Sequence, residues 1–325
     1  MSLEPCIPKI AVVIPCYRVA DHLADVLARI GKEVHCIYCV IDGCTEASGD
    51  VATRAQSHDP RIRVMHLQAN SGVGHAFITG LQKAIEDGAG IIVKLDGDGQ
   101  MPPEKISDLI APLLQGEADF VKGNRFFHLE DLQSMPIIRM IGNAGLSFLS
   151  KLSTGYWNLF DPTNGFVAIK AGVAMRIPWE KVQRRFFFES DLLFRLYTVR
   201  AAVIDVPMKS HYANEQSNLN IPFALVQFPF FHLVNFLKRV FYCYFLREFN
   251  IASMNLVLSF GLMGFGICFG LLNWIRGYEL NRLASAGTVM FAALPLILGW
   301  QALLAFFAFD VGNVPKRPLR HIPSR

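Results

Sequence analysis

Short apolar runs alternate with helical patterns along the first 100 residues of the chain. Four runs rich in branched aliphatic residues predict β-strands, at Lys9–Ile14, Val34–Ile41, Ile62–Leu67 and Ile91–Leu95. Two stretches with apolar residues every three or four positions predict helices, at Asp21–Ile30 and Gly74–Asp87. Strands interleaved with helices of this length predict an α/β fold, with a mostly parallel sheet covered by helices on both faces.

Polar and turn-forming residues follow three of these predicted strands. They are Pro15-Cys16-Tyr17 after the first strand, Asp42-Gly43 after the second and Asp96-Gly97-Asp98-Gly99-Gln100 after the fourth. Ligands of such sheets bind beyond the carboxyl ends of the strands, so we expect these residues to converge on one site. The spacing of Gly72, Gly74 and Gly80 does not fit G-x-G-x-x-G, which disfavours a dinucleotide-binding fold.

Two uncharged apolar stretches near the C-terminus, Ile251–Ile275 and Ala284–Phe309, are long enough to cross the roughly 30 Å hydrocarbon core of a bilayer. Because their connector is short, we expect a transmembrane hairpin whose ends share one compartment. Basic residues flank the hairpin more densely than they occupy the connector: Lys238, Arg239, Arg247, Lys316, Arg317, Arg320 and Arg325. The positive-inside rule predicts a multi-pass protein of the cytoplasmic membrane with its N-terminal domain in the cytoplasm. The first apolar run, Ile10–Ile14, is too short for a signal peptide.

The segment 221–250 combines many aromatic residues with interspersed basic ones. This composition predicts amphipathic juxtamembrane helices that lie in the lipid interface. The alternative is a packed core helix of the globular domain. We therefore divide the chain into a globular domain (1–220), the juxtamembrane helices, two transmembrane helices (251–310) and a basic cytoplasmic tail (311–325).

Composition narrows the choice of partners. Of the 325 residues 52% are hydrophobic, and the formal charge of +4 is modest. No basic stripe with interleaved aromatic residues occurs in 1–220, so we expect a lipid bilayer and no nucleic acid as partner. Seven cysteines are an odd number and predict no disulfide framework. Cys36 and Cys39 lie inside an apolar run and are predicted to be buried strand residues, not a metal or redox pair.

Asp96 and Asp98 carry the sharpest chemical signal. Two carboxylates separated by one small residue at a strand end can hold Mg²⁺ or Mn²⁺, which neutralises a nucleotide diphosphate as it leaves. Surface turns produce the same spacing, but the preceding strand and the following helix start favour the metal site. Asp42 either accepts hydrogen bonds from a base or ribose, or serves as a turn residue before Gly43.

The ordered motifs of the chain resemble those of glycosyltransferase family 2, the inverting GT-A enzymes. Within this family the chain is similar to the dolichol- or polyprenyl-phosphate sugar transferases, of the bacterial type with two C-terminal transmembrane helices. The residues that carry the resemblance are Val12-Val13-Ile14-Pro15-Cys16-Tyr17, Asp42-Gly43, Asn70-Ser71-Gly72-Val73-Gly74, Asp96 to Glu104, Lys122-Gly123-Asn124-Arg125-Phe126, Asp161-Pro162-Thr163-Asn164-Gly165-Phe166 and Phe188-Glu189-Ser190-Asp191-Leu192-Leu193. The resemblance covers about 210 residues in order. It implies a GT-A, Rossmann-like domain that binds a nucleotide-sugar.

The resemblance also implies site residues. Those for the nucleotide-sugar are Pro15, Tyr17, Asp42, Gly74 and Asp96, with Asp96 and Asp98 at the metal and the diphosphate. Arg125 and Arg139 would hold the acceptor phosphate, with Asn143 one turn further on the same side. For the two arginines, solvated surface cations remain the alternative.

Asp98, Asp191 and Arg125 are the catalytic candidates. Asp191 falls where the family has an acidic residue near the reacting sugar, and the competing interpretation is an ion pair with Arg185 or Arg195. Because an acceptor phosphate is already anionic, we assign Asp191 to positioning and not to proton removal.

Departures from the family pattern leave the sugar and the nucleotide open. The family's Asp-Asp-Gly reads Ile41-Asp42-Gly43, and a lysine frequent in the third-strand loop is Val73. The expected reaction is inverting transfer of a hexose or N-acetylhexosamine from a UDP- or GDP-sugar to polyprenyl phosphate. The alternatives are another lipid or glycan acceptor, or an inactive membrane-anchored subunit. The Gly266-x-x-x-Gly270 spacing also allows a homo-oligomer.

Overall fold

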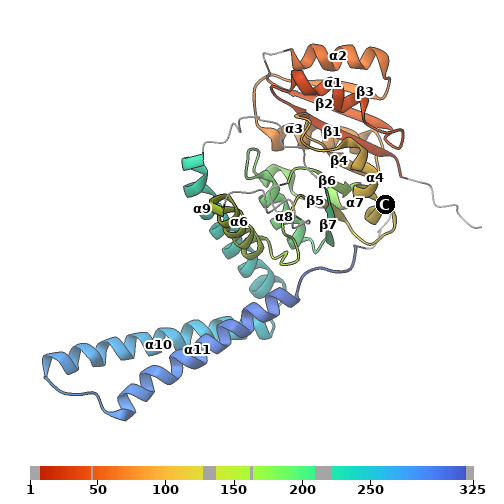
Figure 1. Cartoon of the computed structure of the whole chain (residues 1–325). Coiled ribbons are helices and arrows are strands. Elements are labelled where there is room, and N and C mark those ends of the chain that lie inside the picture. The colour runs from red at the N-terminus through yellow and green to blue at the C-terminus, as the bar shows by residue number, and fades with distance from the viewer. Residues whose placement is uncertain (1–7, 45–46, 127–136, 162–163, 209–220, 320–325) are drawn as a thin grey trace, which may run out of the picture. The chain divides into compact units, whose positions relative to one another are not determined.

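The computed structural model describes residues 8–44, 47–126, 137–161, 164–208 and 221–319 (Figure 1). The chain forms two compact units. The first comprises Met1–Phe236 and Pro315–Arg325, and the second comprises Leu237–Val314. The chain therefore enters the second unit from the first and returns to it, as the N–H of Leu319 shows by donating to Asp119 Oδ2 at 2.8 Å.

The first unit is built on a seven-stranded sheet in the order β3-β2-β1-β4-β6-β5-β7. Its strands are β1 (Ile10–Cys16), β2 (Cys36–Asp42), β3 (Ile62–Leu67), β4 (Ile91–Lys94), β5 (Phe120–Asn124), β6 (Val167–Lys170) and β7 (Val203–Pro207). All neighbouring pairs are parallel except those of β6, which runs antiparallel to β4 and β5. The predicted mostly parallel sheet is confirmed.

Helices cover both faces of this sheet. The helices of the first unit are α1 (Ala20–Ala28), α2 (Ser48–His58), α3 (Val73–Glu86), α4 (Ile106–Leu114), α6 (Ile137–Thr154), α7 (Ala171–Ala174), α8 (Phe188–Thr198) and the first part of α9 (Ile221–Phe241), with 3₁₀ turns at Pro103–Lys105 and Trp179–Lys181.

Alternate residues of the central strands explain why both faces are covered. Val12 faces the core cluster that includes Leu23 of α1 and Leu109 of α4. Its neighbour Val13 faces the other way, where a Cβ on Gly80 of α3 would lie 2.4 Å from Val13 Cγ1. Strands that are apolar at every position bury both faces, as parallel strands require.

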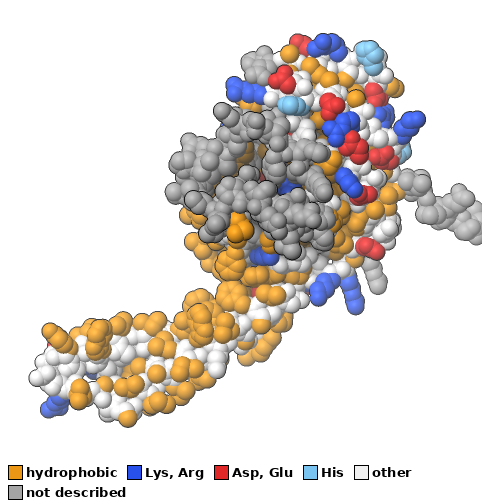
Figure 2. Space-filling view, viewed as in Figure 1, with side chains coloured by type: hydrophobic (Ala, Val, Ile, Leu, Met, Phe, Trp, Pro, Cys, Tyr) orange, Lys and Arg blue, Asp and Glu red, His pale blue; other side chains and the backbone are white. Residues whose placement is uncertain are grey.

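The second unit contains the two apolar helices. They are α10 (Ile251–Glu279) and α11 (Ala286–Gly312), preceded by the end of α9 and a π-helical turn, Tyr242–Arg247. Both are long and apolar enough to cross a membrane, with mean hydropathy of 1.9 and 2.0 over the best 18-residue windows. Hydrophobic side chains cover most of their visible surface (Figure 2). The two predicted apolar helices are confirmed: α10 ends at Glu279 instead of Ile275, and α11 runs from Ala286 to Gly312 instead of from Ala284 to Phe309.

Gly266 explains part of the glycine pattern in α10. A Cβ at this position would lie 2.8 Å from the carbonyl oxygen of Ala292 in α11, and one at Gly270 would lie 3.4 Å from Ala292 Cβ. The small face therefore lets α10 approach α11 within the same chain. Packing of α10 against α11 within one chain accounts for both glycines. The homo-oligomer stays a prediction.

A buried ion pair joins the two ends of the second unit. Arg239 donates to both carboxylate oxygens of Asp310, at 2.6 and 2.9 Å, and the hydroxyl of Tyr244 donates to the same carboxylate at 2.5 Å. Arg239 and Asp310 are both fully buried. Removing one partner of such a pair leaves an uncompensated buried charge.

We expect Asp310→Ala to lower the stability of the detergent-solubilised protein by about 3 kcal/mol, because it strands the Arg239 guanidinium. Thermal unfolding followed by circular dichroism measures the effect. Val311→Ala is the control, since Val311 is the next residue and is 47% exposed. Equal melting temperatures for the two variants would show that the ion pair contributes nothing.

Candidate active site

The carboxyl end of β4 brings three charged side chains together. Lys94 Nζ lies 2.6 Å from Asp96 Oδ1 and 3.5 Å from Glu189 Oε1 of α8. Lys94 is fully buried, whereas Asp96 is 26% exposed. Burial alone would lower the pKa of Lys94, but the charges of Asp96 and Glu189 outweigh it and hold the pKa above its usual value. The lysine is therefore a fixed cation beside the predicted diphosphate site.

Gly165 makes room for this group. A Cβ at this position would lie 2.5 Å from Lys94 Nζ and 2.6 Å from Asp96 Oδ2. Any larger residue would push the ammonium and the carboxylate apart. The segment that ends in Gly165 thus packs directly against the end of β4.

Asp98 is half-buried in the turn that follows. Its Oδ1 accepts the N–H of Gln100 at 3.0 Å, and Gly99 takes the positive φ of 76° that closes the turn. Asp98 is therefore a turn residue and also a carboxylate next to Asp96. The two predictions for it are compatible.

A divalent cation fits this edge. The described part of the chain contains no cluster of three or more His, Cys, Asp or Glu side chains that could hold a metal. Mg²⁺ and similar ions are nevertheless commonly bound by one or two carboxylates together with substrate phosphates. Lys94 contacts Asp96 through Oδ1, while Asp98 uses Oδ1 for Gln100. Asp96 and Asp98 together offer the hard oxygen donors that such an ion requires.

Asp42 at the end of β2 is 2% exposed and binds backbone. Its two oxygens accept the N–H groups of Ser71 and Gly72, each at 2.8 Å. Gly72 has a φ of 97°, and a Cβ there would lie 2.5 Å from the carbonyl oxygen of Arg184. Asp42 therefore orders the loop before α3, and its contact with a nucleotide stays a prediction.

The other predicted nucleotide residues lie around the same loops. Pro15 is buried within β1, and Tyr17 just beyond it is 37% exposed. Gly74 lies in the first turn of α3, where its N–H donates to the carbonyl oxygen of Arg184 at 2.9 Å. A Cβ on Gly74 would lie 2.6 Å from the Phe188 ring. Gly74 thus permits α8 to approach α3.

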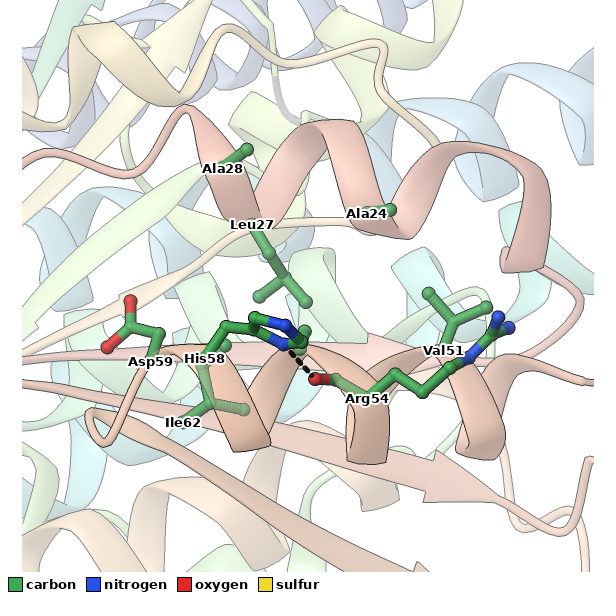
Figure 3. A pocket seen from close by; sticks show the side chains of 9 residues that line it. Ala24, Leu27, Ala28, Val51, Arg54, His58, Asp59 and Ile62 are labelled. Carbon is green, nitrogen blue, oxygen red and sulfur yellow. Dashed lines mark hydrogen bonds between the residues drawn. The ribbon is translucent and has the colours of Figure 1, made fainter.

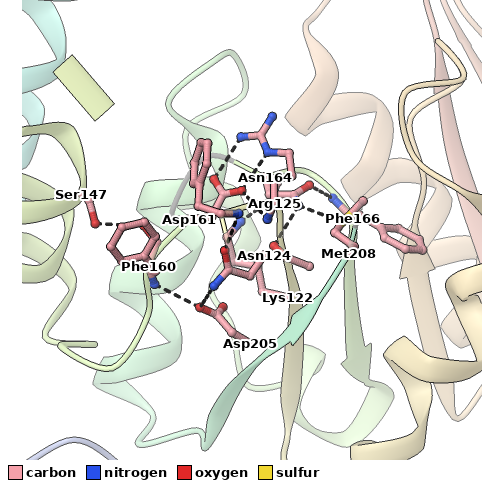
Figure 4. Close-up of polar contacts among 12 residues, drawn as sticks. Lys122, Asn124, Arg125, Ser147, Phe160, Asp161, Asn164, Phe166, Asp205 and Met208 are labelled. Carbon is pink, nitrogen blue, oxygen red and sulfur yellow. Dashed lines mark hydrogen bonds and ion pairs between the residues drawn. The ribbon is translucent and has the colours of Figure 1, made fainter. Parts of the chain in front are cut away.

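Arg125 follows β5 and forms a two-pronged ion pair with Asp161. Its Nε and Nη2 atoms lie 2.7 and 3.0 Å from the two carboxylate oxygens (Figure 4). Asp161 is fully buried; burial would raise its pKa, but Arg125 and Lys122 lower it below the usual value. Arg125 is 22% exposed on its side chain. It is a held guanidinium and not a freely solvated surface cation.

Lys122 lies beneath this pair. It is fully buried, its Nζ donates to the carbonyl oxygen of Asn164, and burial lowers its pKa to about 8. Asn164 in turn donates to the carbonyl oxygen of Gly123 at 2.8 Å. The loop that carries Asp161, Asn164 and Gly165 is therefore anchored to β5 at one end and to the β4 carboxylates at the other. Neither Lys122 nor Lys94 is among the predicted site residues, although each is a charged residue of a buried strand.

Asp205 of β7 completes the buried network. Its Oδ2 accepts the N–H of Phe160 at 3.0 Å and the amide of Asn124 at 3.3 Å. Its Oδ1 is buried without a hydrogen-bond partner among the described residues. Burial raises the pKa of Asp205 from 3.8 to about 6. This carboxyl group therefore keeps its proton to a higher pH in the folded protein than in the unfolded chain.

The raised pKa makes stability depend on pH in a predictable direction. The contribution of Asp205 is fully present below its unfolded value of 3.8 and is lost as the pH rises through about 6. Relative to wild type, we expect the free energy of unfolding of Asp205→Asn to increase by about 1 to 3 kcal/mol as the pH rises from 4 to 7.5. Thermal unfolding across this range measures it, with Asp108→Asn as control because Asp108 is half exposed. The same pH profile in both variants would contradict the assignment.

Asp191 and Glu189 occupy different environments. Asp191 is buried, and its Oδ2 accepts the N–H of Gln183 at 2.9 Å and pairs with Arg195 at 3.3 Å. Its Oδ1 accepts the amide of Asn235 at 3.0 Å. The predicted alternative, a pair with Arg195, is therefore present. Glu189 is the acidic residue of this motif that reaches Lys94.

Helix geometry explains why sequence analysis missed Glu189. Residues two apart on a helix do not face the same side, so only one acid of the Glu189-Ser190-Asp191 motif can point to the edge of the sheet. The spacing alone does not say which.

Arg139 and Asn143 both lie on α6. The Arg139 side chain is outside the described residues, and Asn143 is half-buried.

An apolar groove lies elsewhere in the first unit. It has a volume of about 390 Å³ and runs between α1 and α2 at the start of β3, lined by Leu27, Val51, His58 and Ile62 among others (Figure 3). The start of β3 belongs to the amino edge of the parallel strands. The groove therefore contains none of the predicted site residues.

Comparison with known proteins agrees with this geometry. Residues 11–189 match the family model described as glycosyl transferase family 2. A UDP-N-acetylglucosamine–dolichyl-phosphate N-acetylglucosaminyltransferase of Methanococcus voltae is 33% identical over 178 residues, which cover 54% of this chain and 69% of the relative. An undecaprenyl-phosphate mannosyltransferase of Micrococcus luteus is 28% identical over 204 residues, which cover 62% of this chain and 82% of the relative.

A solved structure shares the fold. Glucosyl-3-phosphoglycerate synthase from Mycobacterium tuberculosis, in complex with Mn²⁺, UDP and glucosyl-3-phosphoglycerate, superimposes with a TM-score of 0.54 at 18% identity. The match covers 71% of this chain and 80% of that chain. The GT-A-like fold expected from the sequence is therefore confirmed. The chain belongs to glycosyltransferase family 2 and is a glycosyltransferase.

Proposed function

We propose that the protein transfers one sugar from a nucleotide-sugar, a UDP- or GDP-activated hexose or N-acetylhexosamine, to a polyprenyl phosphate with inversion at the anomeric carbon. The M. voltae and M. luteus relatives are named for transfer to dolichyl and undecaprenyl phosphate, which supports this acceptor class. The observation that carries the proposal is that Asp161 binds the guanidinium of Arg125 and Gly165, four residues further on, packs against Asp96, in a chain with two apolar helices long enough to span a bilayer.

Asp161 and Gly165 connect the two charged groups along the chain. Asp161 binds Arg125, and Gly165 packs against Asp96. Four peptide units join Asp161 to Gly165, so their Cα atoms lie within about 14 Å of each other whatever the path. This short connection supports placing a donor diphosphate at Asp96 and an acceptor phosphate at Arg125 in one site.

The donor side would use the edge formed by β1, β2 and β4. Pro15, Tyr17 and the loop ordered by Asp42 would line the nucleotide, with Gly74 beneath it. Asp96 and Asp98 would hold Mg²⁺ or Mn²⁺, whose charge offsets that of the departing nucleoside diphosphate. The M. tuberculosis structure is described in complex with Mn²⁺ and UDP, which supports the use of a divalent ion. Lys94 keeps Asp96 oriented by its 2.6 Å contact.

The acceptor side would use Arg125, with Arg139 and Asn143 of α6. A phosphate oxygen of the lipid attacks the anomeric carbon, and the bond from that carbon to the diphosphate oxygen breaks. The attacking oxygen is already anionic, so the protein needs to align charges and not to remove a proton. Arg125 would exchange part of its contact with Asp161 for the lipid phosphate, while Lys122 continues to compensate Asp161.

The apolar helices would place this reaction at a membrane. We propose that α10 and α11 span the cytoplasmic membrane as a hairpin, with 221–250 in the lipid interface and the catalytic domain in the cytoplasm. Exposed apolar side chains on α9 support the interfacial role: Phe230, Leu233, Leu237 and Phe241 are each more than half exposed. The acceptor is itself a membrane lipid, so an anchored enzyme meets it in two dimensions.

A donor panel tests the proposal. Purified protein in detergent is incubated with Mn²⁺ or Mg²⁺, undecaprenyl phosphate and each of several radiolabelled UDP- and GDP-sugars, and label in the organic phase is counted. Transfer from one donor that requires undecaprenyl phosphate is the expected result. No label from any donor, with nucleotide binding intact, would sink the proposal and favour another acceptor or an inactive subunit.

A further inference from the structure

Helix α9 contacts the start of α8 through directional bonds that the reaction above does not use. Asn235 Nδ2 donates to Asp191 Oδ1 at 3.0 Å, and both side chains are buried. Three residues earlier, the His232 ring lies edge-on to the Phe187 ring with centres 4.8 Å apart. Ser153 Oγ of α6 lies 2.7 Å from His232 Nδ1. These contacts fix the register of α9 against both α8 and α6.

Asp191 connects these contacts to the loop before α8. Its second carboxylate oxygen accepts the N–H of Gln183 and pairs with Arg195 one turn further along the helix. The carboxylate therefore ties the 183–187 loop, the body of α8 and α9 to one point. Without the Asn235 amide, one oxygen of a buried carboxylate would lose its hydrogen-bond donor.

Glu189 lies two residues before Asp191, on a different side of the same helical turn. Its carboxylate reaches Lys94 at 3.5 Å, and Lys94 orients Asp96 at 2.6 Å. A rotation or shift of the first turn of α8 would therefore change the position of Glu189 relative to both. The turn links α9, which leads into the second unit along the chain, with the charged group at the end of β4.

We propose that Asn235 is a positioning residue for glycosyl transfer, acting through Asp191 to hold the first turn of α8 so that Glu189 meets Lys94. The inference rests on the proposed function. It assigns a catalytic consequence to a residue of the helix that enters the second unit. Neither Asn235 nor Asp191 touches substrate in this account.

Kinetics of Asn235→Ala test the proposal. We expect kcat to fall about 10-fold, because a hydrogen bond to a buried charge is lost, while KM for the nucleotide-sugar changes less than about 2-fold. The matched control is Asn158→Ala, which removes an amide that donates to the carbonyl oxygen of Val203 at 3.2 Å. Thermal unfolding of both variants establishes that equal amounts of folded protein are compared.

Exchanging the two partners separates positioning from general damage. Asn235→Asp places a second carboxylate beside Asp191 and should lower kcat more than Asn235→Ala does. Adding Asp191→Asn restores one amide and one carboxylate in exchanged places. We expect the kcat of the double variant to be at least about 3-fold higher than that of Asn235→Asp. The reason is that the double variant again forms a hydrogen bond between an amide and a carboxylate at these two positions.

Amide hydrogen exchange gives a reading that does not depend on turnover. The Gln183 N–H, held by Asp191, should exchange faster in Asn235→Ala than in wild type or Asn158→Ala. If wild type transfers no sugar, the proposed function fails and exchange at Gln183 decides the positioning claim alone. Unchanged exchange, kcat equal to that of the control, or a double variant no better than Asn235→Asp would each overturn the inference.

Discussion

Replacing Asp98 with asparagine is expected to lower kcat/KM for the nucleotide-sugar about 1000-fold, the scale on which transition-state charge is stabilised in such sites. Asparagine has the same shape and keeps an oxygen to accept the N–H of Gln100, which Asp98 Oδ1 accepts at 3.0 Å. The turn should therefore survive while the negative charge is lost. A neutral amide cannot compensate the positive charge of a divalent ion in the way that a carboxylate does.

The control for this substitution is Asp108→Asn, because Asp108 is half exposed on α4 and pairs with its neighbour Lys105. Two measurements distinguish the variants. Sugar transfer reports the chemistry, and electron paramagnetic resonance of Mn²⁺ in the presence of UDP reports ion binding. An Asp98→Asn protein that binds Mn²⁺ and transfers sugar as wild type does would show that the β4 edge is not the donor site.

Replacing Arg125 with glutamine is expected to lower kcat/KM for the polyprenyl phosphate about 100-fold, because a two-pronged charged contact to phosphate is worth more than a neutral one. The donor should bind as before. The kcat/KM of Arg125→Lys should fall between those of wild type and Arg125→Gln, since an ammonium keeps the charge but cannot hold two oxygens in one plane. Initial rates at varied acceptor and saturating donor measure the effect.

Asp161 complicates this experiment and must be controlled. It is fully buried, and Arg125 is one of the two cations that hold its pKa low, so Arg125→Gln leaves a poorly compensated carboxylate. The paired variant Arg125→Gln/Asp161→Asn removes both charges and should regain stability without regaining acceptor affinity. Arg176→Gln, on an exposed arginine, is the surface control. Recovery of acceptor affinity in the paired variant would contradict a phosphate-binding role for Arg125.

The sequence predicted the part of the fold that local patterns encode. The strands from Ile10 to Lys94 appear within two residues of their expected ends, because each is a short apolar run bounded by turn residues. The apolar helices α10 and α11 were equally clear by length. The strands β5, β6 and β7 were not predicted; β5 and β7 each contain a charged residue inside the strand, so neither is a simple apolar run.

The buried charges explain what the sequence could not show about the site. Lys94 and Lys122 are lysines inside strands, and only the folded chain reveals that loop carbonyls and carboxylates compensate them. Asp191 matched a family position, yet its carboxylate is occupied by Arg195 and Asn235. Asp96 and Arg195 are near neighbours in the sequence, but Glu189, Asn164 and Asn235 come from more than 40 positions away, and no local pattern encodes such pairings. The contact of Asp42 with a nucleotide stays a prediction.

The central claim is that one sugar passes from a nucleotide to a polyprenyl phosphate. Mass spectrometry of the lipid extract, together with the amount of nucleoside diphosphate released, tests it most directly. The account predicts that the lipid phosphate gains the mass of one sugar residue, one molecule for each diphosphate released, and that Asp98→Asn slows both by the same factor of about 1000. Diphosphate released without any gain in lipid mass, or sugar found on another acceptor, would contradict it.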